Sequence, residues 1–360
     1  MTARINNRVT LRDVAGALGM DKSTVSNALS GKGNVSAKTR ARITAVAREL
    51  GYEPNPLAQR LATGHRNETI CLFSGVLDTG ITTDKVLLIQ QALAEWELEA
   101  PIYACGKLSR EPGRTQMAQI RQLRRQQPRA ILCASQLVDI SVYTELEAYQ
   151  RDGGLVISYD TPSPLDCDQV IFDREDNTYQ AARHLLLQGH RRIAIGLSRL
   201  IWQPTYSEGD TQQQRLRGFF RALEEFGILP LPEWQFRHGS YERGGEEMAR
   251  QFLSLAPAER PTGICIINDH VALAFMAEVI RAGVRIPQDL SVIGHDNQPI
   301  AAYCPVPLTS MTQPTERIAN TVVELLMDRI RGGGADTVPQ RITISSELVQ
   351  RLSVSPPIPG

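Results

Sequence analysis

The chain has 360 residues, of which 42% are apolar and 22% charged, values that exclude a fibrous or wholly disordered protein. One domain usually takes roughly 100 to 200 residues, so this length favours two or three compact units. No run approaches the roughly 18 apolar residues of a membrane-spanning helix, and arginines stand where a secretory signal would have its apolar core. We therefore expect a soluble, cytoplasmic protein that spans no membrane.

The net charge of zero conceals an uneven distribution along the chain. Residues 1–66 hold eleven Lys and Arg against four Asp and Glu, a net charge of +7. The remaining residues hold 28 against 35, a net charge of −7. A basic head on an acidic body indicates that the head binds a polyanion such as nucleic acid.

Three short helices are predicted in the first fifty residues. Thr10 and Asp13 form a capping-box pattern before the first helix, which ends at Gly19. The second lies within residues 21–31 and the third within 36–51, each with apolar residues at helical spacing. Two helices joined by a three-residue turn and braced by a third are typical of a helix-turn-helix, which we assign to residues 1–53.

A further short helix is predicted directly after this head. Asn55 can cap it, Pro56 suits a first helical position and Gly64 ends it. Isolated helices shorter than ~12 residues are marginal in water, so this segment needs a partner to form. We assign residues 54–68 to a hinge helix and linker.

From Thr69 onward, short apolar runs alternate with longer amphipathic stretches. The predicted strands are residues 69–74, 101–104, 129–134, 154–159, 168–172, 192–196, 262–267, 290–294 and 341–345. The predicted helices are residues 84–97, 114–126, 175–188, 212–226, 243–254, 270–282 and 314–331. This alternation predicts parallel sheets covered on both faces. The fold class is therefore multidomain α and α/β, and residues 69–360 are too many for one sheet, so we expect two doubly wound α/β lobes.

Several motifs stand in an order typical of one family. They are Val9-Thr10-Leu11-Arg12-Asp13-Val14-Ala15, Ser23-Thr24-Val25-Ser26, Leu29-Ser30-Gly31, Leu50-Gly51-Tyr52, Pro54-Asn55, Gly189-His190-Arg191-Arg192-Ile193, Arg215-Leu216-Arg217-Gly218-Phe219, Asn268-Asp269, the run 284–294 and Pro307-Leu308-Thr309. Over nearly its whole length the chain resembles the lactose-repressor/galactose-repressor (LacI/GalR) family of transcriptional regulators.

The resemblance implies a homodimer or a pair of dimers, and a core similar to the periplasmic sugar-binding proteins. The chain of such a core crosses between lobes three times, here near residues 160–168, 297–300 and 331–340. The first lobe would then hold about 69–165 and 299–332, and the second about 166–298 and 333–360. No heptad extension follows residue 352, which favours a dimer over a tetramer.

One face of the second helix carries the candidate base-reading side chains, Lys22, Ser23, Ser26 and Asn27. A recognition helix needs this arrangement because base edges are read from one side of a helix in the major groove. The groups suited to phosphate contacts are those of Thr10, Thr24, Asn34 and Arg40. A solvated polar face is the alternative, which the basic head and the resemblance make less favourable.

Leu57 and Leu61 lie one turn apart on the predicted hinge helix. The resemblance implies that Leu61 inserts into the minor groove at the operator centre and kinks the DNA, which costs a few kcal/mol in unstacking. The alternative is that the two leucines pack against the core or the second chain of a dimer. Both interpretations require two chains.

A cleft between two α/β lobes is a natural site for a small molecule. The resemblance assigns Arg215, Asn268 and Asp296 to ligand binding, and it adds Asp160 at a strand end and Tyr241 as an aromatic cover. Carboxylates, an amide and a guanidinium bind neighbouring hydroxyls, so this set predicts a sugar-like effector. Structural ion pairing of the charged residues is the alternative.

Three departures from the family pattern leave the effector's identity open. Residues 77–83 lack the usual Asn-Pro-aromatic segment, Arg174 replaces a usual Asn, and His295 replaces a usual aromatic residue. An effector without a sugar ring is therefore also compatible with the sequence.

Enzyme activity is not expected, because the sequence shows no zinc-binding HExxH, no phosphate loop and no GxSxG elbow. We expect no metal and no cofactor. The sequence predicts a repressor of a palindromic operator that responds to a small molecule, as inducer or corepressor. The alternative function is an architectural DNA-bending protein whose core only dimerises.

Asn27 generates a prediction about base choice. Many relatives have Arg here, whose fork fits guanine, whereas Asn pairs with N6 and N7 of adenine, so the half-site should prefer A·T by about 1–3 kcal/mol. Selection of operators from random-sequence DNA, run with wild type and Asn27→Arg, measures this preference. If both proteins select the same base at every position, Asn27 contacts only phosphate or water, and Lys22, Ser23 and the hinge read the sequence.

Overall fold

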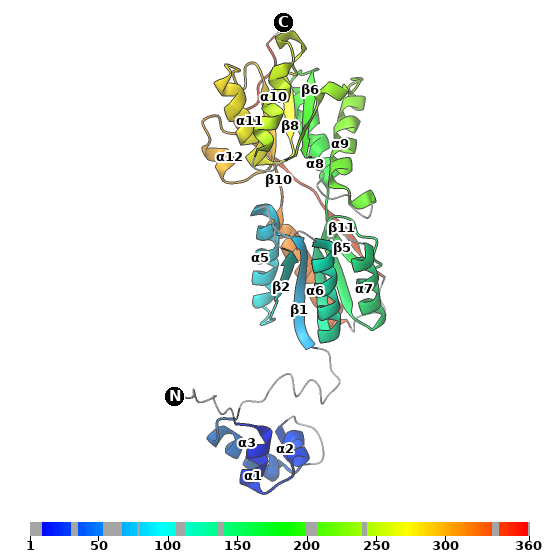
Figure 1. The fold of residues 1–360 in the computed structure, drawn as a ribbon, viewed down its shortest axis with the longest axis vertical. Helices are drawn as coiled ribbons and strands as arrows, with labels where there is room; N and C mark the ends of the chain where they lie inside the picture. Colours follow the sequence, from blue (N-terminus) through cyan, green and yellow to red (C-terminus); the bar gives the residue numbers. More distant parts are fainter. Residues whose placement is uncertain are drawn as a thin grey trace. The chain divides into compact units, whose positions relative to one another are not determined.

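The computed structural model describes residues 9–29, 35–52, 67–77, 80–105, 112–134, 140–198, 207–239, 243–332 and 338–358. The chain divides into two compact units, Met1–Asn67 and Glu68–Gly360 (Figure 1). Most of the predicted hinge, including Leu57 and Leu61, lies outside the described residues, as do Asn34 and Tyr241.

The first unit contains the predicted helices α1 (Leu11–Leu18), α2 (Lys22–Leu29) and α3 (Ala37–Glu49). The carboxylate of Asp13 accepts from the Thr10 backbone N–H at 2.8 Å, and Gly19 ends α1 with a φ of 60°. The Ser36 hydroxyl accepts from the Thr39 N–H at 3.2 Å and caps α3. The buried apolar residues are Val14, Ala15, Leu18, Val25, Ala28, Ile43 and Ala47. The predicted helix-turn-helix is confirmed.

The first lobe of the second unit is a sheet with the strand order β11-β5-β4-β3-β1-β2. Its strands are β1 (Asn67–Val76), β2 (Ile102–Cys105), β3 (Pro128–Ala134), β4 (Leu155–Asp160), β5 (Asp168–Phe172) and β11 (Arg341–Ile344). Its helices are α5 (Gly80–Ala94), α6 (Pro112–Gln126), α7 (Ile140–Arg151) and α13 (Thr315–Arg331).

Strand β3 shows why both faces of this sheet are apolar. Ala130, Leu132 and Ala134 pack in the cluster that includes residues of α5 and α13. Ile131 and Cys133 point to the opposite face and pack in the cluster with residues of α6 and α7. Side chains alternate across a strand, so a strand that is covered on both faces reads as a continuous apolar run.

The second lobe is a sheet with the order β12-β10-β9-β8-β6-β7, in which β12 pairs with β10 antiparallel. Its strands are β6 (Ile193–Ser198), β7 (Gln235–His238), β8 (Gly263–Ile266), β9 (Ser291–Asp296), β10 (Thr309–Thr312) and β12 (Leu348–Val349). Residues of α8 (Arg174–Leu187) and α9 (Thr211–Glu225) pack in one cluster with it, and residues of α10 (Gly244–Ser254) and α11 (Asp269–Arg281) in another. Short helices complete it: α12 (Ile300–Tyr303), η1 (Ser207–Gly209), η2 (Pro232–Trp234) and η3 (Pro257–Glu259).

The predicted lobe boundaries are wrong by several residues. Strand β5 pairs with β4 and β11 in the first lobe, so the first crossing follows Phe172 rather than lying near 160–168. The second crossing follows β10, after Thr312, and not near 297–300. The third follows β11, after Ile344, and not near 331–340. The crossings could not be placed from the sequence because strand pairing is set by non-local contacts. In addition, β10 has the sequence Thr-Ser-Met-Thr and lacks the apolar run that predicts a strand.

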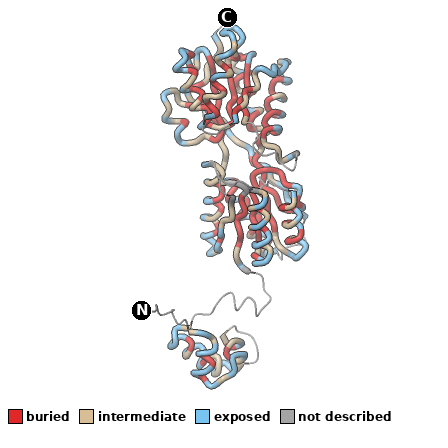
Figure 2. Tube along the Cα trace, viewed as in Figure 1, coloured by how far each residue is buried: buried red, intermediate tan, exposed pale blue. Residues whose placement is uncertain are grey.

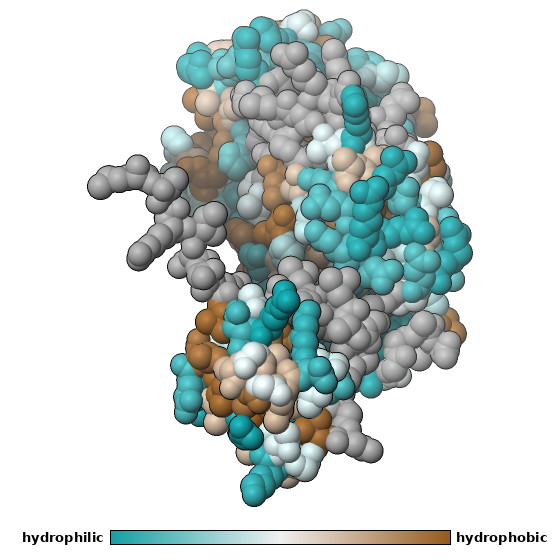
Figure 3. Space-filling view, turned by 60° about the horizontal axis from the view of Figure 1, so that its bottom comes forward, coloured by the Kyte–Doolittle hydropathy of each residue, from teal (hydrophilic) through white to brown (hydrophobic). Residues whose placement is uncertain are grey.

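Buried residues concentrate in the sheets and on the helix faces that contact them (Figure 2). In the view of Figure 3, hydrophilic side chains cover much of the described surface, with smaller hydrophobic areas between them. No helix in the described ranges is both long enough and apolar enough to cross a membrane.

The contact between α8 and α9 depends on a glycine. A Cβ added at Gly218 would lie 2.0 Å from the backbone carbonyl oxygen of Glu175, which cannot move without shifting α8. Gly218→Ala should therefore lower the free energy of unfolding by about 3 kcal/mol, the upper end of typical overpacking costs. Gly80→Ala is the matched control, because its Cβ would meet only the Gln298 side chain at 3.7 Å. Equal denaturation midpoints for the two variants would contradict the close helix packing.

Candidate DNA-binding surface and ligand-binding cleft

Helix α2 presents one exposed polar face in the first unit. Lys22, Ser23 and Asn27 are exposed, and Thr24 and Ser26 are half-buried. Val25 and Ala28 are buried on the opposite side, which holds the face outward. Of the other residues assigned to DNA, Thr10 is exposed and donates its hydroxyl to Asp13 at 2.6 Å, and Arg40 is half-buried. Contact of each of these residues with DNA stays a prediction.

A cavity of about 160 Å³ lies between the lobes of the second unit. Residues of both lobes line it: Ile81, Thr82, Lys85, Asp160, Arg174, Ser198, Thr211, Gln212, Arg215, His238, Ile267, Asn268, Val271, Asp296 and Gln313. Four of the five effector residues that the sequence proposed therefore meet at one place. The structure adds Lys85, Arg174, His238 and Gln313, which the sequence did not assign to the site.

The carboxyl ends of parallel strands position the two acidic residues of the cavity. Asp160 is the last residue of β4 and Asp296 the last of β9. Both have the left-handed backbone conformation, with φ of 82° and 95°. Such a conformation is uncommon for a non-glycine residue. It turns the chain sharply out of the sheet at the strand end, where each carboxylate lines the cavity.

Asp160 binds two buried cations, and we call Lys85, Asp160 and Arg174 the Asp160 cluster. One carboxylate oxygen pairs with the Lys85 ammonium. Arg174 donates through Nη2 to the other at 2.8 Å and through Nη1 to the Asp160 backbone carbonyl at 2.7 Å. Burial raises the pKa of Asp160, but the charges of Arg174 and Lys85 outweigh it and hold the pKa far below its ordinary 3.8. Both carboxylate oxygens thus have partners within the protein. This agrees with the alternative interpretation of Asp160, in which it forms a structural ion pair.

Asp296 is held by amides rather than by cations. It accepts from Asn268 Nδ2 at 3.1 Å and from Gln313 Nε2 at 3.0 Å. Burial raises its pKa. Asn268 also accepts from the Val271 N–H at 3.2 Å and so caps α11. These bonds fix the two side chains in one orientation at the cavity wall.

Arg215 differs from the other cations of the cavity because no carboxylate within the described ranges forms an ion pair with it. Its Nη1 reaches only the Thr211 carbonyl, at 3.4 Å, and its buried Nε has no hydrogen-bond partner there. Burial, together with the charge of Arg174, lowers its pKa to about 10.

His295, the third departure from the family pattern, lies outside the cavity wall. Its ring nitrogen Nδ1 lies 2.8 Å from the Ile266 carbonyl, and burial lowers its pKa to about 3. The ring is therefore neutral at physiological pH and supports strand β8 rather than a ligand.

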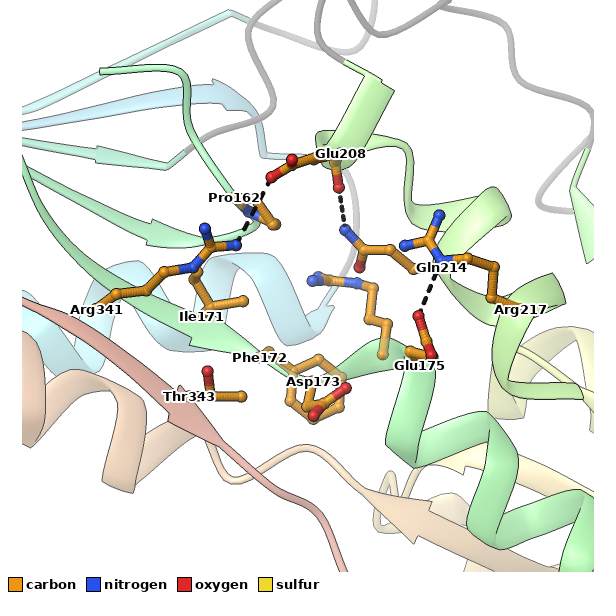
Figure 4. A pocket seen from close by; sticks show the side chains of 11 residues that line it. Pro162, Ile171, Phe172, Asp173, Glu175, Glu208, Gln214, Arg217, Arg341 and Thr343 are labelled. Carbon is orange, nitrogen blue, oxygen red and sulfur yellow. Dashed lines mark hydrogen bonds and ion pairs between the residues drawn. The ribbon is translucent and has the colours of Figure 1, made fainter. Parts of the chain in front are cut away.

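A larger cavity, of about 460 Å³, lies beside the crossings (Figure 4). Four of its charged groups form two ion pairs: Arg341 with Glu208 at 3.8 Å, and Arg217 with Glu175 at 2.8 Å. Gln214 donates to the Glu208 carbonyl at 2.5 Å. More than half of the Arg341 and Glu208 side chains is exposed, so this cavity is open to water, and the smaller one is the better ligand site. Among the described residues, no group of three or more His, Cys, Asp or Glu is arranged to hold a metal ion.

A helix-turn-helix followed by two doubly wound lobes that enclose a polar cavity defines a class: regulators that join a DNA-reading unit to a ligand-binding core. Residues 10–55 match the model of the bacterial regulatory proteins of the lacI family, and residues 182–354 match the periplasmic binding protein-like domain. The HTH-type transcriptional repressor PurR of Photobacterium profundum is 30% identical over 352 residues, which cover 96% of this chain and 98% of that protein.

Solved structures agree over nearly the whole chain. The Lac repressor bound to ONPG in the repressed state is 25% identical with a TM-score of 0.74, and the match covers 96% of this chain and all of that one. The complex of the transcriptional regulator CelR with cellobiose is 25% identical with a TM-score of 0.68, at the same coverage of 96%. The chain belongs to the LacI family and is a DNA-binding transcriptional regulator. The predicted family and fold class are confirmed.

The Asp160 cluster generates a prediction about stability. Asp160→Asn leaves two buried cations without their carboxylate, and loss of one partner of a buried ion pair costs about 3–5 kcal/mol. Glu145→Gln is the matched control, because Glu145 also binds two cations, Arg121 and Arg124, but at the surface, where such pairs contribute less than about 1 kcal/mol. Denaturant titration at pH 7 measures both losses.

The pH dependence of stability gives a second prediction for Asp160→Asn. The lowered pKa of Asp160 means that its stabilising contribution is present above the ordinary value of 3.8 and is lost as the pH falls below it. Asp160→Asn should show a flatter loss of stability in acid than wild type. A similar small loss at pH 7 for both variants would contradict a central role for the cluster.

Proposed function

We propose that the protein is a transcriptional repressor that binds a palindromic operator as a homodimer, and that a small molecule in the cavity between the lobes changes its operator affinity. The observation that carries this proposal is the buried polar cavity, lined from both lobes, in a chain that also has an exposed recognition face on α2. A ligand that contacts both lobes changes their relative position, which is the physical basis of a regulatory response.

The DNA interface combines base reading with charge. Lys22, Ser23, Ser26 and Asn27 read base edges, and Thr10, Thr24, Asn34 and Arg40 contact phosphates. Leu57 and Leu61 of the hinge open the minor groove at the operator centre. The net charge of +7 over residues 1–66 supports binding to a polyanion. The curated relative PurR is named a repressor, which supports repression over activation.

The effector is a small, hydroxyl-rich metabolite. The solved relatives hold cellobiose in CelR and ONPG in the Lac repressor. The cavity of about 160 Å³ is smaller than the roughly 300–1,000 Å³ of sites for drug-sized ligands, which favours a monosaccharide-sized molecule. Arg215, Asn268 and Asp296 contact it directly, Tyr241 covers it, and Asp160 orients the cations beside it. The protein acts in the cytoplasm, where a bacterial operator lies.

A salt titration tests the DNA side of the proposal. Binding of the full-length protein to an operator selected from random sequence should weaken with a slope of log K against log salt steeper than about −2, since each phosphate contact contributes about −0.9. Arg40→Ala should make the slope shallower by about 1.8, because a dimer loses two phosphate contacts of about 0.9 each. Arg151→Ala, an exposed arginine at the end of α7, should leave it unchanged.

Two outcomes would overturn the proposal. A slope shallower than about −2 for wild type would mean that the basic head does not bind phosphates. An operator affinity that stays constant across a panel of sugars and sugar derivatives would favour the alternative function, a DNA-bending protein whose core only dimerises.

A further inference from the structure

The charges that line the cavity do not balance. Six ionisable groups among the described residues of its wall are at least nine-tenths buried: Lys85 (2% exposed), Arg174 (4%), Arg215 (6%), Asp160 (4%), Asp296 (8%) and His238 (3%). Three are cations, two are carboxylates and one is an imidazole, so the described part of the wall carries a net positive charge even when both carboxylates are ionised and the imidazole is neutral. An unbalanced charge away from water is costly unless a partner of opposite sign is supplied.

The surplus is located at Arg215. Asp160 is shared by Lys85 and Arg174, and Asp296 receives its hydrogen bonds from the amides of Asn268 and Gln313. Within the described ranges, Arg215 keeps guanidinium donors without a hydrogen-bond partner, among them Nε, at the wall of the cavity. A planar guanidinium of this kind matches the two oxygens of a carboxylate or phosphate.

Two acids near the cavity but outside its wall, Asp269 and Asp210, already have partners of their own among the described residues. Asp269 is a further buried acid, and it accepts from the Ser310 hydroxyl and the Gln298 N–H, both at 2.7 Å. Burial, with the charge of Asp296, raises its pKa to about 7, although the charge of Arg351 acts to lower it. Asp210 caps α9 by accepting from the Gln212 and Gln213 N–H groups.

A neutral polyol would leave the surplus positive charge uncompensated. Each oxygen of Asp160 and of Asp296 already accepts one hydrogen bond, so these carboxylates offer only their remaining lone pairs to ligand hydroxyls. The cavity instead offers an excess of donors, which fits a ligand rich in acceptors.

We propose that the effector carries an oxyanion, a carboxylate or a phosphate group, that binds the guanidinium of Arg215. The inference rests on the proposed function only in using the same cavity, and it narrows the effector from a sugar to an acidic one, such as a polyhydroxy acid or a phosphate ester. Lys85 and Arg174 add positive potential at the same wall, and Asp160 keeps both cations in place.

Thermal unfolding of the full-length protein tests this with simple anions as probes. Phosphate or acetate, each compared with chloride at equal ionic strength, should raise the Tm of wild type by roughly 2 to 4 °C near saturation. Arg215→Gln should lose this increase. Arg217→Gln is the matched control, because Arg217 lies on the same helix but is half-exposed and paired with Glu175, so its increase should equal that of wild type.

The outcomes distinguish a carboxylate effector from a phosphate effector, and they test the acidic effector separately from the regulatory function. A larger shift with acetate indicates a carboxylate effector, and a larger shift with phosphate indicates a phosphate ester. No shift beyond chloride, or an equal shift in Arg215→Gln, overturns the inference. If a neutral sugar changes operator affinity while neither anion shifts Tm, the proposed function stands and the acidic effector is wrong. If the shift depends on Arg215 but no effector changes operator affinity, the anion site stands and the regulatory function is wrong.

Discussion

The carboxylate of Asp160 connects the parts of the core that must act together. Lys85 comes from α5 and Asp160 from the end of β4, both in the first lobe, whereas Arg174 begins α8 in the second. The Arg174–Asp160 pair therefore joins the two lobes beside the first crossing of the chain, whereas the Lys85–Asp160 pair lies within the first lobe. All three side chains are buried, so removal of this carboxylate would leave two cations uncompensated away from water, which is costly.

The architecture explains why such a cluster forms at this place. In each lobe the strands that end at the cavity are parallel, so their carboxyl ends lie at one edge of the sheet. The left-handed residues Asp160 and Asp296 end strands at those edges. Helix α11 begins at the same edge, where Asn268 caps it and also binds Asp296. Polar groups thus gather at the interface of two lobes whose interiors are otherwise apolar.

Close helix packing and cavity chemistry are linked through α9. Gly218 allows this helix to approach the backbone of α8 at Glu175, next to Arg174. Arg215 lies one turn earlier on α9 and reaches the cavity, while Arg217 points to the Glu175 side and forms an exposed pair. The spacing of two residues places one arginine in a dry site and the other in water, which is why they have different chemical roles.

Elements whose signals are local could be predicted from the sequence alone. The helix-turn-helix was predicted from the caps at Thr10 and Ser36, from Gly19 and from apolar residues at helical spacing. Most strands of the core were predicted from short apolar runs. The family resemblance predicted that Asp160, Arg215, Asn268 and Asp296 lie in one cleft. In the structure all four line the same cavity.

Strand pairing, the places where the chain crosses between lobes and the meeting of charges depend on the folded chain. Strand β10 is buried by its neighbours although its sequence is largely polar, and β5 joins the first sheet through contacts with β4 and β11. Lys85 lies 75 residues from Asp160 along the chain, and in sequence a single lysine on an amphipathic helix looks the same whether it faces water or a buried carboxylate. Arg174 stood out only as a departure from the family pattern. Its role depends on the position of Asp160 in three dimensions, because electrostatic pairing follows distance in space and not distance along the chain.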